Sequence, residues 1–178
     1  ASSSVIAKHE GILEIDELRT VERVNAEGVK SNVVIGRSTE MRIVDTNTGI
    51  TLTTGNVPYG SSLYVKPGAK LKKGELICDW DPYNAVIVSE FGGSVEFEHI
   101  KENVTYREES DEQTGFREKV IIESRDKTMS PLIRIVDKKG ESLKTYNIPV
   151  SAHIIVNEAA KIEPGEVLVK IPRVTGKT

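Results

Sequence analysis

The sequence predicts an all-β protein made of two tandem units, and three observations support this prediction. First, residues 56–81 recur 91 positions later, at 147–172, with seven identical positions. Second, apolar and polar residues alternate over short runs that are separated by turn-forming residues, which is the pattern of half-buried strands. Third, no segment shows a helical period longer than about two turns. A pattern repeated over this length is typical of a duplicated structural unit.

Shorter blocks extend the duplication toward the N-terminus. The motif RIVD occurs at 42–45 and again at 134–137, and an apolar block at 33–35 matches 120–122. Upstream of that block, the second copy carries five additional residues. We therefore expect two domains with a linker at each end. The expected segments are a linker at 1–9, a first domain at 10–86, a second domain at 87–173 and a linker at 174–178.

The strand signals follow one another in order, with turn chemistry between them. Gly- and Pro-containing turns are expected at 26–28, 46–49, 66–68 and 72–74. The strands are too apolar for both faces to be solvated, so each unit must close on itself as a small barrel or sandwich. The expected strands are 12–15, 18–21, 32–35, 40–44, 51–53 and 62–65 in the first unit, and 95–97, 104–106, 119–122, 132–136, 153–156 and 166–171 in the second.

The segment 57–82 resembles half of a barrel-sandwich hybrid, the fold of biotinyl and lipoyl carrier domains. In those domains, the strand after a Gly-Glu turn runs to a hairpin tip that carries a modifiable lysine. The expected tip here is DPYN at 81–84, and the expected return strand is 85–88. No lysine lies between Glu75 and Lys101. A cofactor cannot be attached to this tip, which disfavours a carrier.

Composition and charge indicate a soluble globular chain with one or two modest cores. The 178 residues include 24 basic and 27 acidic side chains, for a formal net charge of -3. The densest basic cluster consists of Lys66, Lys70, Lys72 and Lys73. We interpret it as the solvated side of a hairpin rather than as a phosphate-binding stripe. Strong direct binding of nucleic acid is therefore not expected.

The single cysteine, Cys78, excludes an intramolecular disulfide. It aligns with Val169 of the second copy, so we expect a small buried side chain there. No apolar run is long enough to span a membrane, and the first residues lack the features of an export signal. A cytoplasmic protein is the resulting expectation.

Residues that could carry chemistry are scattered along the sequence. The three histidines, His9, His99 and His153, lack the spacing of metal ligands. The acidic run at 108–112 lacks the alternation and central glycine of a calcium loop. No phosphate-binding loop and no nucleophile beside a general base is present. We therefore expect no catalytic, cofactor-binding or metal-binding residue in this chain.

The only tryptophan, Trp80, aligns with Ile171. This alignment favours a packing role in the core or between the units. The alternative is an aromatic anchor in an interface with a partner, where tryptophan is enriched. The candidate packing or interface residues are Trp80, Asp81, Pro82 and Tyr83.

Six short motifs occur in a specific order: VPYG at 57–60, KGE at 73–75, WDP at 80–82, DEQTG at 111–115, RIVD at 134–137 and IPR at 171–173. This series resembles the large insertion in the trigger loop of the β′ subunit of bacterial DNA-directed RNA polymerase. The resemblance covers essentially the whole chain. It implies two sandwich-barrel hybrid motifs, which agrees with the duplication. The first four residues, ASSS, resemble the exit from the first trigger helix, and VTGKT at 174–178 resembles the approach to the second.

The resemblance also implies a function. The parent enzyme is a nucleotidyltransferase, and the insertion would tune nucleotide addition, pausing and transcript cleavage through trigger-loop mobility without supplying a catalytic group. The magnesium and zinc sites of the family match no residues here. The implied partners are other regions of β′, the β subunit and elongation factors of the secondary channel. The alternative is a free-standing β-rich interaction or carrier-like module with a barrel-sandwich hybrid fold.

Overall fold

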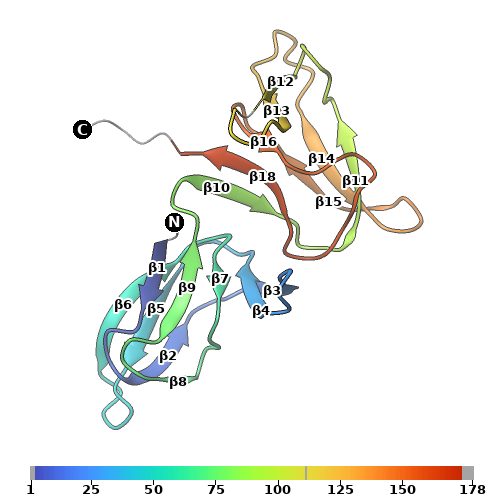
Figure 1. Ribbon diagram of the computed structural model, residues 1–178. Helices are drawn as coiled ribbons and strands as arrows, with labels where there is room; N and C mark the ends of the chain where they lie inside the picture. The colour runs from blue at the N-terminus through green and yellow to red at the C-terminus, as the bar shows by residue number, and fades with distance from the viewer. Residues whose placement is uncertain (1–2, 111, 174–178) are drawn as a thin grey trace. The chain divides into compact units, whose positions relative to one another are not determined.

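The computed structural model describes residues 3–110 and 112–173, which form strands β1 to β18 and, within those ranges, no helix (Figure 1). The chain divides into two compact units, with the division between Pro82 and Tyr83. Each unit contains nine strands arranged in two antiparallel sheets. The structure confirms the predicted all-β fold with two tandem units.

The first unit is built from a five-stranded and a four-stranded sheet. The larger sheet has the order β1-β9-β7-β4-β3, and the smaller has the order β6-β5-β2-β8. Its strands are β1 (Ser3–Ile6), β2 (Gly11–Ile15), β3 (Thr20–Val24), β4 (Lys30–Val34), β5 (Thr39–Val44), β6 (Thr51–Val57), β7 (Ser62–Leu63), β8 (Lys70–Leu71) and β9 (Leu76–Trp80).

The second unit repeats this topology nine strands later. Its sheets have the orders β10-β18-β16-β13-β12 and β15-β14-β11-β17. Each strand therefore has the same neighbours as its counterpart in the first unit. The strands are β10 (Asn84–Val88), β11 (Gly93–Glu98), β12 (Tyr106–Ser110), β13 (Arg117–Ile121), β14 (Leu132–Val136), β15 (Ser142–Asn147), β16 (His153–Ile154), β17 (Lys161–Ile162) and β18 (Val167–Pro172).

Each unit has its own hydrophobic core, to which both of its sheets contribute. Alternation along β5 buries Met41 and Ile43, and the cross-strand partner of Ile43 on β2 is the buried Leu13. In the second unit, Ile135 of β14 and its partner Val95 of β11 are fully buried in the same way. The alternation of apolar and polar residues along each strand thus places one face of the strand against the core.

The expected linker at 1–9 contains a strand. Residues 3–6 form β1, which pairs with β9 along the edge of the larger sheet. Val5 packs against the core of the first unit, and Ala7 lies within it. The sequence shows only one short apolar pair here. The strand forms because it pairs with residues that lie 70 or more positions away, and a local pattern does not reveal such a partner. The expected linker at 174–178 lies outside the described residues.

The expected hairpin around 81–84 does not form. Strand β9 pairs with β1 and β7, whereas β10 pairs with β18. The predicted strand at 85–88 is confirmed as β10. The prediction that it pairs with the strand before the tip is wrong. The segment 81–83 instead leads from the last strand of the first unit to the first strand of the second.

The duplicated RIVD motif has the same structural role in both units. Arg42 on β5 forms ion pairs with Glu14 at 3.2 Å and with Asp16 at 2.9 Å. The Arg42 guanidinium, which donates hydrogen bonds to Asp16, lowers the pKa of that carboxyl. Arg134 forms the corresponding pairs with Glu96 and Glu98. Ion pairs of this exposed kind contribute little to stability individually.

Two equivalent glycines mark the tightest backbone approach in each unit. A Cβ atom on Gly11 would overlap the carbonyl oxygen of Val44 and lie 2.8 Å from Ile43 Cγ2. A Cβ atom on Gly93 would overlap the carbonyl oxygen of Val136 in the same way. Since the obstacle is backbone, the strands must separate to admit a methyl group.

We expect Gly11→Ala and Gly93→Ala each to lower the free energy of unfolding by about 2 kcal/mol, the cost of forcing an extra group into a packed site. The measurement is urea denaturation of the 178-residue chain, followed by circular dichroism. Thr54→Ala, on the exposed surface of β6, serves as the control and should change the midpoint little. Unchanged midpoints in both glycine variants would show that the strands separate without cost.

Candidate functional site

The predicted set Trp80 to Tyr83 lies at the passage between the units. Trp80 is the last residue of β9, pairs with Ser3 of β1 and packs against the core of the first unit. Asp81 and Pro82 are partly buried, and Tyr83 is 58% exposed. The structure therefore places the four residues along one segment, with tryptophan packed inward and tyrosine presented at the surface.

The four lysines of the basic cluster are all exposed. Lys70 on β8 lies 4.0 Å from Glu10, which partly neutralises it. The backbone N–H of Lys72 donates to the carboxylate of Glu75 across the turn. The cluster thus borders two carboxylates, unlike the uninterrupted basic stripe that phosphate binding favours.

The three histidines lie on separate elements, and each has a polar partner. His9 Nδ1 lies 2.6 Å from Thr53 Oγ1, and His99 Nδ1 lies 3.2 Å from the carbonyl oxygen of Ser130. His153 Nδ1 lies 2.6 Å from the carboxylate of Glu118.

Among residues 3–110 and 112–173, no three His, Cys, Asp or Glu side chains group in a way that could hold a metal ion. In the acidic run, Glu108 pairs with Arg117 and Glu109 with Arg107, whereas Asp111 lies outside the described residues.

Cys78 is fully buried in β9, and its counterpart Val169 is fully buried in β18. Burial raises the pKa of the Cys78 thiol to about 11, because the thiolate would lose its hydration. The side chain therefore behaves as a small apolar group, as its alignment with valine predicts.

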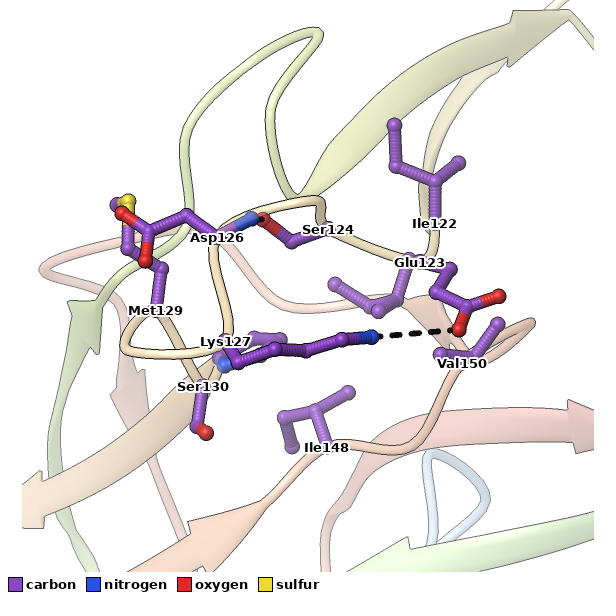
Figure 2. Close-up of a pocket in the computed structure, with 11 residues that line it drawn as sticks. Ile122, Glu123, Ser124, Asp126, Lys127, Met129, Ser130, Ile148 and Val150 are labelled. Atoms are coloured by element: carbon purple, nitrogen blue, oxygen red, sulfur yellow. Dashed lines mark hydrogen bonds and ion pairs between the residues drawn. The ribbon is translucent and has the colours of Figure 1, made fainter.

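A hollow in the second unit was not foreseen from the sequence. It lies beside the link 122–131, which connects β13 to β14 and is longer than the corresponding link 35–38 in the first unit. Figure 2 shows Ile148 and Val150 on one side, with Lys127 reaching toward Glu123; the ion pair measures 3.4 Å. The only sequence signal for it is the greater spacing between the repeat blocks 120–122 and 134–137.

The volume of this hollow, about 210 Å³, indicates what it can accommodate. Small-molecule and cofactor sites usually enclose about 300–1,000 Å³. The hollow is smaller than that, and its lining combines apolar side chains such as Ile148 and Val150 with the exposed ion pair of Lys127 and Glu123.

Within residues 3–110 and 112–173, the structure contains no helix with the length and apolar character needed to cross a bilayer. The fold therefore defines a duplicated β-rich module of two units with the same strand order.

Comparison with known proteins shows where such a module occurs. The chain is 55% identical over 176 residues to DNA-directed RNA polymerase subunit beta' of Parabacteroides distasonis, and 53% identical over 177 residues to that of Bacteroides thetaiotaomicron. It is 49% identical over 176 residues to the corresponding subunit of Flavobacterium psychrophilum. The alignments cover 98–99% of this chain but 12% of each relative. No family model matches the sequence.

The chain is thus homologous to a segment of the bacterial RNA polymerase β′ subunit, and it spans about one eighth of the length of these relatives.

We expect the Cys78 thiol to react with a disulfide reagent at pH 8 at least about a hundredfold more slowly in the native chain than in guanidinium chloride. The raised pKa lowers the fraction of reactive thiolate, and burial limits access of the reagent to the sulfur. The measurement is the release of thionitrobenzoate. Cys78→Val, which copies the second unit, is the control without a thiol and should keep the native fold. Similar rates in both conditions would contradict the buried placement.

Proposed function

We propose that this chain is a part of an RNA polymerase β′ subunit, and specifically the insertion within its trigger loop. The observation that carries the proposal is the identity of about 50% with β′ subunits across almost the entire chain. The order of the six sequence motifs supports the finer assignment to the trigger loop. On this proposal, the whole subunit takes part in DNA-templated RNA synthesis in the cytoplasm.

The two-unit architecture supports a role as a body carried by a moving loop. Every strand pairs within its own set of nine, and each unit has its own core. We propose that the chain segments before β1 and after β18 connect this body to the two trigger helices. A folded body of this kind must move when the loop to which it is attached folds or unfolds.

The proposed mechanism is a shift in the populations of the trigger loop. A contact made by the insertion in only one position of the loop stabilises that position over the other. A difference of about 1.4 kcal/mol changes the ratio of folded to unfolded loop tenfold. The expected consequences are changes in nucleotide addition, pausing and transcript cleavage.

We propose that the insertion acts without supplying a catalytic group. The chemistry of its side chains supports this: the Cys78 thiol is buried with a raised pKa, and His153 is paired with a carboxylate. Magnesium and zinc would be held elsewhere in the parent subunit.

The proposed partners are other regions of β′, the β subunit and elongation factors of the secondary channel. The net charge of -3 disfavours strong direct binding to DNA. We propose the exposed Tyr83, together with Asp81 and Pro82, as one contact surface, while Trp80 fixes the segment to the core of the first unit.

The first experiment removes the insertion from a whole polymerase of the same source. Residues 3–172 are replaced by a short Gly/Ser linker, because these bounds remove β1 and β18 completely and leave no unpaired strand. Single-nucleotide addition rates, pause lifetimes and factor-stimulated cleavage are compared with those of the intact enzyme. A second variant removes only 83–172, which deletes the second unit and retains all nine strands of the first.

We expect addition to continue while pause lifetimes or cleavage change severalfold, and the smaller deletion to show which unit carries the effect. Loss of addition by orders of magnitude in a correctly assembled enzyme would contradict the non-catalytic proposal. Unchanged pausing and cleavage in both deletions would contradict the regulatory one.

We expect Trp80→Ala to lower the free energy of unfolding of the 178-residue chain by about 3 kcal/mol, because a large packed ring is lost. Tyr83→Ala should change it by less than about 0.5 kcal/mol, as is usual for an exposed position. In the whole polymerase, Tyr83→Ala should nevertheless alter pausing. Wild-type pausing in that variant would exclude Tyr83 from the interface.

A further inference from the structure

Strand β1 can leave the first unit without displacing any other strand. It has four residues, lies at one end of the larger sheet and pairs on one side with β9. All the other strands of the unit follow it in the chain, so β1 is joined to them at one end alone, through the buried Ala7. Its register with β9 also shifts between Val5 and Ile6.

The side chains of β1 contribute little to the core. Ser3 and Ser4 are polar, and Ile6 is 48% exposed. Val5 is the one residue of the strand that packs against the core, where it faces Cys78 of β9 across the ladder. Because the free energy gained by burial follows the apolar area removed from water, this strand is held by far less than the unit as a whole.

β10 is the equivalent strand of the second unit, since it pairs with β18 as β1 pairs with β9. Its residues 85–88, AVIV, stand where β1 has SSVI. Val88 is 1% exposed, whereas its counterpart Ile6 is 48% exposed. β10 is also continuous with other strands at both ends, and the backbone N–H of Arg173 donates to the carbonyl oxygen of Tyr83 just before it. The same place in the fold is thus closed firmly in one copy and lightly in the other.

The direction of pairing determines how β1 responds to a pull. Ser3, the first residue of β1, is the partner of Trp80, the last residue of β9. A pull on the chain before Ser3 therefore acts at the end of the ladder, and the pairs break one after another rather than together. Detachment frees four residues, which span about 13 Å when extended. It leaves β9 paired with β7.

We infer that β1 is a releasable latch: it detaches from β9 when the chain before it is pulled, while the rest of the first unit stays folded. Release lengthens the connection to the body by up to about 13 Å. The body can then keep a contact with a partner while the connected loop changes conformation. The source of the pull rests on the proposed function, in which the segment before β1 leads to a trigger helix. The ease of detachment does not.

The Cys78 thiol reports on detachment, because Val5 faces it across the ladder. Its labelling by a disulfide reagent is followed in the 178-residue chain at urea concentrations well below the unfolding midpoint. If β1 opens alone, the labelling rate should depend weakly on urea, because local opening exposes little surface. Gly11→Ala weakens the unit from the other sheet and should change this rate less than about twofold. Labelling through global unfolding would instead accelerate about thirtyfold in that variant, the equivalent of about 2 kcal/mol.

A variant that strengthens the latch gives an independent check. Ser4→Val copies Val86 of the second unit at an exposed position and should slow the labelling of Cys78 about threefold, because a β-branched residue favours the strand. The matched control is Ser142→Val, the same exchange at an exposed position of the edge strand β15. It should leave the labelling rate unchanged.

The second test locks the latch in the whole polymerase. Val5→Cys places a thiol opposite Cys78, and directly paired residues of antiparallel strands lie within the range of a disulfide. Oxidation of this variant by oxidised glutathione should change pause lifetimes severalfold, and reduction should restore them. Val5→Cys combined with Cys78→Val cannot form this bond. Treated in the same way, it is the control for the other thiols of the enzyme.

Two results would overturn the inference. Labelling of Cys78 with the full urea dependence of global unfolding, or with thirtyfold acceleration by Gly11→Ala, would show that β1 stays attached until the unit unfolds. Unchanged pausing in the locked polymerase, when deletion of 3–172 does alter pausing, would show that the released length is not used. If the deletion leaves pausing unchanged as well, the proposed function fails, and the labelling alone decides whether β1 detaches.

Discussion

The core shared by the two sheets of each unit is the constraint on which the rest of this structure depends. Its strands are short, and several contain two residues, so backbone pairing alone would not hold them. Leu63 in β7 and Leu71 in β8 are nevertheless completely buried, because each two-residue strand delivers an apolar side chain to the core. Burial of this kind, together with antiparallel pairing to longer neighbours, fixes the position of the turns between these strands.

The duplication lets the chain serve as its own control. Several residues that both copies retain have equivalent structural roles. Gly11 and Gly93 approach equivalent backbone oxygens, and the arginine of each RIVD motif pairs with two carboxylates on or directly after the neighbouring strand. The copies differ by apolar exchanges in the core, such as Cys78 for Val169, and by larger changes at the surface. One surface difference is the longer link 122–131, which lines a hollow in the second unit.

This arrangement is compatible with the proposed role of the chain as a modulating part of a larger enzyme. Two copies of a self-contained β unit provide a stable body, since each buries its own core and pairs its own strands. Contacts with partners need only a few exposed side chains, and small differences in contact energy are sufficient to bias a two-state loop. The stability of the body and its proposed regulatory contacts therefore reside in different residues.

The sequence by itself determined the all-β class, the duplication and the buried position of Cys78, because period-two patterning, repeat spacing and residue type are local properties. Tertiary structure decided the rest. Pairing of residues 3–6 with β9, and of β10 with β18 rather than β9, depends on partners distant along the chain. The hollow beside Val150 was signalled in the sequence only by a longer spacing between two repeat blocks, because it arises where segments far apart in the sequence meet in space.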